Sequence, residues 1–229
     1  GDPARVMIVY DLRYASDHFT GIGAHAHSLL TALLSADGPT RYRVLWRRGE
    51  RVTRFDLQAF SDHPRVEWHE STAPSLGFAA PLATGAWLRR LGGDVYLSPF
   101  YLQPVGAGMP VVLTLHDAMH LVPEVGSPWG IRMRFALALF AARGADAVIT
   151  SSQFSRAEIL RLTGLNAGRL FVVPLGVPAP SPTTAQRPAG VPTGPFALSV
   201  GGNRPHKELT TLARVWRGSV SDGATFGDH

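Results

Sequence analysis

Short, continuously apolar segments alternate with longer helical patterns along this chain, and this alternation restricts its fold more than any other feature. Continuous apolar strands are typical of a parallel sheet that helices cover on both faces. The sequence therefore predicts a doubly wound α/β fold. The predicted strands are 5–11, 42–46, 65–69, 94–98, 110–117, 146–152, 169–174 and 196–201, and the main predicted helices are 21–36, 82–91, 129–143 and 154–162.

A proline-rich stretch divides the chain. Residues 174–195 contain seven prolines, which interrupt helices and central strands, so we interpret this stretch as an interdomain linker. Residues 1–173 would form one domain before it. Residues 196–229 hold an apolar run, a glycine turn and a helical pattern at 207–217. A segment this short cannot bury a core of its own, so we expect the first βα unit of an incomplete second domain.

Composition excludes several classes of site and location. The chain has no cysteine, which excludes disulfides, thiolate metal sites and a cysteine nucleophile. No apolar run reaches the roughly 18 residues that cross a bilayer. A cytoplasmic location is the simplest expectation, with peripheral contact at the inner face of the membrane as the alternative.

The charge balance is basic, with a net charge of +5 and 21 arginines beside the one lysine, Lys207. Such a surface suits nucleic acid, anionic lipid headgroups or phosphorylated small molecules. We do not expect nucleic acid, because no helix-turn-helix, zinc-finger spacing or aromatic RNA-binding motif accompanies the arginines.

Gly21 and Gly23 stand where the first helical pattern begins. Glycines let backbone amides approach a ligand, and a helix N-terminus offers free N–H groups to an anion. The alternative is a plain helix entry after a tight turn. The third glycine of a dinucleotide fingerprint is missing, so NAD binding is not expected.

His116 and Asp117 follow an apolar strand, at the edge where open α/β sheets bind ligands. The histidine could hydrogen-bond a sugar hydroxyl or phosphate, and the carboxylate could orient it or contact an acceptor. The alternative is a histidine satisfied by backbone at the corner after the strand. His120 lies four residues further on, but Pro123 and the lack of other ligands argue against zinc, and no metal site is predicted.

Ser151 and Ser152 end another predicted strand, where Ser152 or its neighbour is a good helix N-cap. Both stay candidates for the acceptor side, and the absence of a GxSxG pattern argues against acyl transfer.

The predicted helix at 129–143 is strongly apolar and carries three arginines. Core packing is the prediction there, and a membrane-facing role is the alternative.

The second glycine turn, Gly201 and Gly202, is followed by a basic cluster. Arg204, His206 and Lys207 gather at the start of the last helical pattern. Backbone amides, the helix dipole and cationic side chains would together neutralise a diphosphate there.

Five motifs in register resemble the GT-B glycosyltransferases of family 4, the retaining group-1 type. They are TGIGAHAHSLLTALL, LTLHDAMHLVPE, ADAVITSSQFSRAEIL, LFVVPLGV and FALSVGGNRPHKEL. The resemblance covers nearly the whole chain to about Arg217. It implies two Rossmann-like domains that face a cleft, with the acceptor mainly on the N-terminal domain and the nucleotide-sugar donor mainly on the C-terminal one.

The resemblance also implies roles for single residues. Gly21 and Gly23 would lie near the donor phosphates and the acceptor. His116 would face the donor sugar at the reaction centre, with Asp117 beside it. Lys207 matches the family's diphosphate-binding lysine.

Three features depart from the family pattern. The companion arginine normally follows the strand glycine directly, so Arg204 is a displaced candidate, and Glu208 stands where close relatives commonly carry asparagine. The chain also ends before the family's paired glutamates, which hold the donor. We therefore expect this chain to be inactive by itself.

The resemblance implies the acceptor-side half of an enzyme that transfers a sugar from a nucleoside-diphosphate sugar to a glycan, lipid-linked or small-molecule acceptor. GDP-mannose is the donor that we expect, because GNRPHK resembles the corresponding residues of mannosyl- and rhamnosyltransferase-like members. No metal or cofactor is expected. The alternative is a non-catalytic module that binds a glycan or pairs with a separate C-terminal donor half. An unrelated nucleotide-binding α/β enzyme is the weaker third possibility.

Overall fold

The computed structural model describes residues 6–122, 125–176, 190, 191, 194, 196, 198, 199 and 208–221, with the side chains of the last range described to Arg217. The chain divides into two compact units, Gly1–Pro178 and Ala179–His229. Each unit is described by itself.

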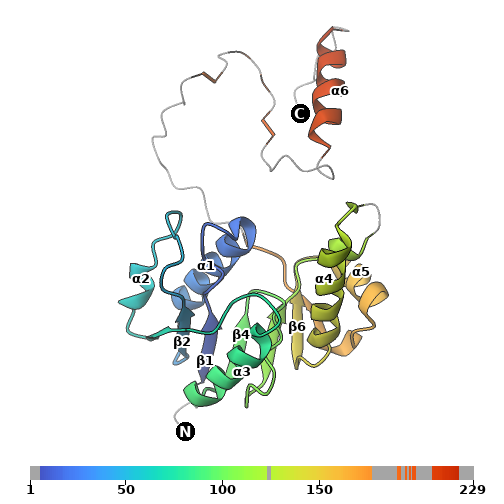
Figure 1. Ribbon diagram of the computed structural model, residues 1–229. Helices are drawn as coiled ribbons and strands as arrows, with labels where there is room; N and C mark the ends of the chain where they lie inside the picture. The colour runs from blue at the N-terminus through green and yellow to red at the C-terminus, as the bar shows by residue number, and fades with distance from the viewer. Residues whose placement is uncertain are drawn as a thin grey trace. The chain divides into compact units, whose positions relative to one another are not determined.

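The first unit is built on one sheet of seven parallel strands in the order β3-β2-β1-β4-β5-β6-β7 (Figure 1). The strands are β1 (Met7–Asp11), β2 (Arg41–Trp46), β3 (Val66–Glu70), β4 (Val95–Ser98), β5 (Val111–Thr114), β6 (Ala147–Thr150) and β7 (Leu170–Val172). Each predicted strand before the proline-rich stretch is confirmed, with ends shifted by up to three residues. The parallel pairing confirms the predicted α/β class.

Five helices connect these strands. They are α1 (Thr20–Ser35), α2 (Gln58–Ser61), α3 (Ala80–Leu91), α4 (Trp129–Ala142) and α5 (Gln153–Thr163), and two short 3-10 turns are η1 (Met119–Leu121) and η3 (Ala167–Arg169). The four long helices confirm the predicted ones. The short α2 and the 3-10 turns were not predicted, because a single turn leaves no periodic pattern in a sequence.

Each face of the sheet has its own apolar cluster, because neighbouring side chains on a strand point to opposite faces. Val9 points to the face covered by α3, α4 and α5, where Leu139 and Ile159 are also buried. Tyr10 points to the other face, where it packs with Leu30 of α1. Helices on both faces make the fold doubly wound and Rossmann-like, in agreement with the predicted GT-B N-terminal domain.

The direction of winding reverses beside β1. The chain moves from β1 outward to β2 and β3, and α3 then returns it to β4 on the other side of β1. Ligands of open α/β sheets bind at such a reversal, outside the carboxyl ends of the strands. A ligand site is therefore expected at the carboxyl ends of β1, β4 and β5.

The second unit contains α6 (Leu209–Ser221), which confirms the helix predicted at 207–217. Three residues of the strand predicted at 196–201 are described, and none of them is in a strand. Most of the predicted linker, and residues 222–229, lie outside the described part of the chain. In the ranges that are described, no helix is both long and apolar enough to span a bilayer.

Candidate functional site

His116 lies two residues beyond the end of β5, at the predicted edge of the sheet. Its Nε2 atom is 3.1 Å from the carbonyl oxygen of Pro99. A carbonyl only accepts, so Nε2 must carry the hydrogen and Nδ1 is left as an acceptor. The backbone contact expected in the alternative interpretation is therefore present, and it still leaves one ring nitrogen for a ligand.

His25 of α1 meets this ring edge to face, with 5.0 Å between the ring centroids. Burial, and then the neighbouring His116, lower the pKa of His25 to about 4. Burial also lowers the pKa of His116, against smaller opposing effects of the Pro99 carbonyl and Asp117. Both rings are therefore neutral at pH 7, and the pair suits a hydroxyl better than an ion pair with phosphate.

We expect His25 to make the fold less stable in acid. The pKa of His25 is lower in the folded chain than in the unfolded one, so its contribution is complete above about pH 6.5 and is lost as the pH falls toward 4. The loss should be on the order of 1 kcal/mol, because the ring is partly exposed. Urea unfolding of the wild-type chain and of His25→Asn at pH 7.5 and 4.5 measures it. Equal losses in both proteins would contradict the assignment.

Asp117 and Ser152 both have structural contacts. Asp117 Oδ1 accepts a hydrogen bond from the Met119 N–H at 3.0 Å, which fixes the start of η1. Ser152 Oγ accepts from the Ser155 N–H at 3.0 Å, which confirms the predicted N-cap of α5. The Asp117 side chain is still exposed, whereas the Ser152 hydroxyl is engaged in the cap.

Gly21 and Gly23 lie in the first turn of α1, as predicted, but in different surroundings. A Cβ on Gly23 would lie 2.9 Å from the Tyr14 carbonyl oxygen and 3.3 Å from that of Ser16. A Cβ on Gly21 would meet nothing within 4 Å. Packing of α1 on the preceding loop thus explains Gly23, while Gly21 is open to solvent or a ligand.

The start of α1 is compatible with an anion. Its first turn contains no acidic residue, and no side chain of the described residues caps its N-terminus. The first N–H groups of a helix have no partner inside the helix, and its dipole favours negative charge there.

A groove of about 540 Å³ runs beside His25. Its walls come from α1, from the carboxyl ends of β5 and β6, and from the segment after β7, and its lining residues are His25, His27, Ser28, Leu29, Thr31, Ala32, Thr114, Ile149, Thr150, Ser151, Val173, Pro174, Leu175 and Gly176. The apolar cluster on the α1 face includes no described residue of β5, β6 or β7. The groove therefore lies between α1 and the strands that this apolar cluster does not include, and Ser151 is the predicted acceptor-side residue that borders it.

Sequence reasoning missed a buried ion pair at the carboxyl end of β1. Asp11 and Arg13 are almost fully buried and joined by two contacts, Nη2 to Oδ2 at 2.6 Å and Nε to Oδ1 at 2.8 Å. The Tyr96 hydroxyl of β4 donates to the same carboxylate at 2.5 Å. Burial, and then Asp11, raise the pKa of Tyr96, so its phenol keeps the proton that it donates.

This ion pair fixes two loops beside the site. Arg13 Nη1 donates to the Ala73 carbonyl at 3.0 Å, and Tyr14 donates to the Ser75 carbonyl at 3.1 Å. The loop after β1 is thereby joined to the loop before α3. The available signal was a pair of opposite charges two residues apart directly after an apolar strand, at DLR.

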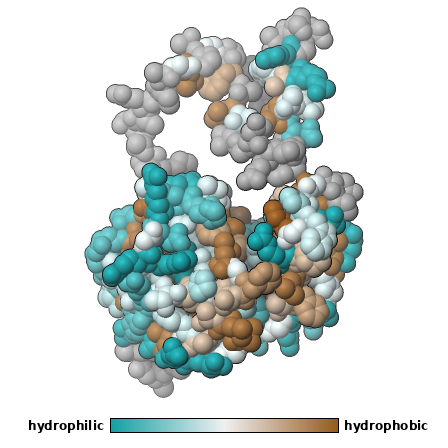
Figure 2. All heavy atoms as spheres, in the orientation of Figure 1, coloured by the Kyte–Doolittle hydropathy of each residue, from teal (hydrophilic) through white to brown (hydrophobic). Residues whose placement is uncertain are grey.

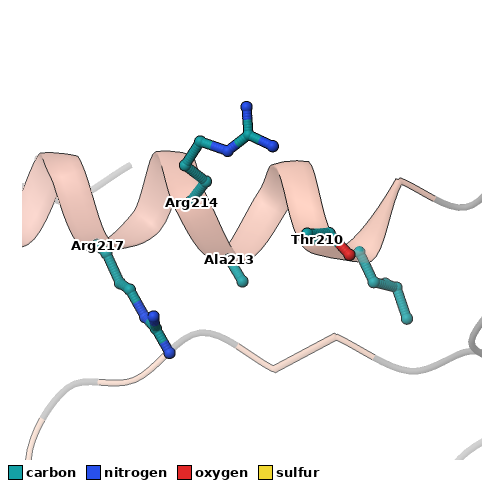
Figure 3. A pocket seen from close by; sticks show the side chains of 5 residues that line it. Thr210, Ala213, Arg214 and Arg217 are labelled. Atoms are coloured by element: carbon teal, nitrogen blue, oxygen red, sulfur yellow. The ribbon is translucent and has the colours of Figure 1, made fainter.

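Arg204 and Lys207, the predicted diphosphate residues, lie outside the described residues. Among the described residues, a pocket on the surface of α6 is lined by Leu209, Thr210, Ala213, Arg214 and Arg217. Arg214 and Arg217 point to different sides of α6 (Figure 3) and so do not converge on one ligand. Across the described ranges, no three histidine or acidic side chains are grouped to hold a metal ion.

Comparison with known families agrees with this geometry. The family model described as Glycosyltransferase Family 4 matches residues 19–179, which span both glycines, both histidines and Ser151. A search of curated proteins found no match. Because the family match covers more than half of the chain, the chain belongs to glycosyltransferase family 4.

Proposed function

We propose that this chain works in the transfer of a sugar, with retained anomeric configuration, from a nucleoside-diphosphate sugar to a glycan, lipid-linked or small-molecule acceptor. The neutral His116–His25 pair at the reversal of the sheet carries the proposal, in a chain of a glycosyltransferase family. GDP-mannose is the donor that we favour, from the residues GNRPHK at 202–207.

His116 would contact the sugar. Its Nε2–H is held by Pro99, so its Nδ1 is the atom that would accept a hydrogen bond from a sugar hydroxyl. The open start of α1 at Gly21, together with Lys207 and Arg204, would stabilise the leaving diphosphate, which is the main electrostatic demand of the reaction. We propose no nucleophile, metal or cofactor from the protein.

The acceptor side would involve Asp117 and Ser151. The Asp117 carboxylate is exposed next to His116, and Ser151 borders the groove beside His25. Ser152 is a weaker candidate than Ser151, because its hydroxyl already caps α5.

Nuclear magnetic resonance of the histidine rings tests the proposal without requiring turnover. GDP-mannose, GDP-glucose and UDP-glucose are titrated into the chain, and we expect one of them to shift the Cε1–H signals of His116 and His25. His116→Asn should abolish the shift of His25, whereas His63→Asn, in the loop before β3, should leave both shifts intact. A lack of response to nucleotide sugars and to acceptor sugars alike would contradict the proposal.

The groove beside His25 favours one second candidate, a non-catalytic module. An apolar groove of this size suits a partner polypeptide, such as a separate donor half, or a bound glycan. A saturable response of His25 to glycans, with none to any nucleotide sugar, would favour this second function.

A further inference from the structure

The surface of α4 carries an apolar stripe. Trp129, Met133, Leu137 and Phe140 are 74%, 50%, 53% and 65% exposed. Successive helix residues are about 100° apart, so these four side chains fall within an arc of about 80°. We call them the α4 stripe.

One side of α4 packs in the core, as predicted, and the stripe is a side of the helix that the core does not cover. Only Phe135, Leu139 and Ala142 of α4 are buried, and they lie roughly opposite the stripe. The helix is apolar on more than one side, and one side suffices for contact with the sheet. Exposed apolar patches of this kind mark interaction surfaces.

Arginines flank the stripe on both sides. By the same helical spacing, Arg132 and Arg143 lie on one side of it and Arg134 on the other. Arg143 lies over the ring of Phe140 at 5.3 Å, and Arg134 donates to the carbonyl of Gly130. Within the described part of the chain, none of the three forms an ion pair, and α4 has no acidic residue.

The charge pattern indicates what kind of partner binds the α4 stripe. An apolar stripe between rows of arginines matches a helix that lies in the membrane interface, with its arginines at the level of anionic headgroups. A second copy of the chain would bring like charges together, which opposes self-association. Figure 2 shows hydrophobic and hydrophilic side chains side by side over the region of α4.

We propose that the α4 stripe binds the surface of an anionic lipid bilayer, with α4 parallel to the membrane. Trp129, Met133, Leu137 and Phe140 enter the headgroup and acyl boundary, and the three arginines contact lipid phosphates. This contact is separate from the site at His116 and does not depend on the sugar transfer proposed above.

Vesicle co-sedimentation tests the proposal with the full chain. Vesicles of phosphatidylcholine and phosphatidylglycerol should bind the chain, and vesicles of phosphatidylcholine alone should bind it much less. Leu137→Glu should lower the affinity at least about ten-fold, because it places a charge within the apolar stripe. The double variant Arg132→Gln/Arg134→Gln should lower it about 25-fold, or about five-fold for each arginine.

Two matched controls separate the stripe from general charge. Ala36→Glu adds the same charge at an exposed position directly after α1, outside the groove beside His25, and should bind as the wild type does. Arg48→Gln/Arg51→Gln removes two highly exposed arginines elsewhere and should change the affinity less than two-fold.

Three results would overturn the proposal. One is a wild-type chain that sediments equally with and without phosphatidylglycerol. Another is Leu137→Glu and the arginine double variant both binding as tightly as the wild type. The third is a dimer in vesicle-free solution that Leu137→Glu dissociates, because the stripe would then be an interface between copies.

Discussion

Replacement of Arg13 by methionine should lower the free energy of unfolding by about 3–5 kcal/mol, because it leaves the buried Asp11 carboxylate without its cation. Methionine keeps most of the side-chain length, so the loss reports the charge rather than a cavity. Urea unfolding at pH 7 measures it.

Two variants control this experiment. Arg48→Met removes the same kind of side chain from an exposed ion pair with Glu70. It should lower the free energy of unfolding by less than about 1 kcal/mol. The double variant Asp11→Asn/Arg13→Met removes both charges and should recover a large part of the loss. A loss in Arg13→Met no greater than that in Arg48→Met would contradict the buried pair.

Alanine at Gly23 should destabilise the fold and alanine at Gly21 should not, so that the free energies of unfolding of the two variants differ by about 2–3 kcal/mol. At Gly23 the new methyl group would press on two backbone carbonyls, of Tyr14 and Ser16, which cannot move away as a side chain end could. At Gly21 there is room, and alanine is a better helix former than glycine, so Gly21→Ala should be neutral or slightly stabilising.

Thermal unfolding measures this difference, and ligand titration then separates packing from binding. If backbone amides at Gly21 approach a phosphate, Gly21→Ala should weaken nucleotide-sugar binding while the fold stays intact. Equal destabilisation by both alanines would show that α1 does not rest on the loop after β1 as described.

The sheet could be predicted from the sequence because buried parallel strands are continuously apolar. Residues 7–10 and 147–149 are such runs, and each lies in a strand. The ends of the strands were less certain. The predicted strand 110–117 includes His116 and Asp117, which lie beyond Thr114, the last residue of β5 that pairs with β6.

The contacts of the site could be predicted only in part. The sequence showed that His116 follows a strand. Its partner His25 lies 91 residues earlier, and the sequence showed only that His25 belongs to a helix, not that this helix brings it to His116. The same holds for Arg13, whose partners Ala73 and Thr84 come from a distant loop and helix. For α4 the number of apolar residues was visible, but not which of them the sheet would cover.

The edge-to-face contact of His25 and His116 makes the two imidazoles one titrating unit. The ring centroids are 5.0 Å apart, so a proton on one ring repels a proton on the other. The pair therefore takes up a first proton more readily than a second. A sugar or phosphate beside His116 therefore meets at most a single positive charge at any pH well above 4, where His25 stays neutral. The charge that a bound ligand experiences there is set jointly by the first helix and the segment that follows the fifth strand.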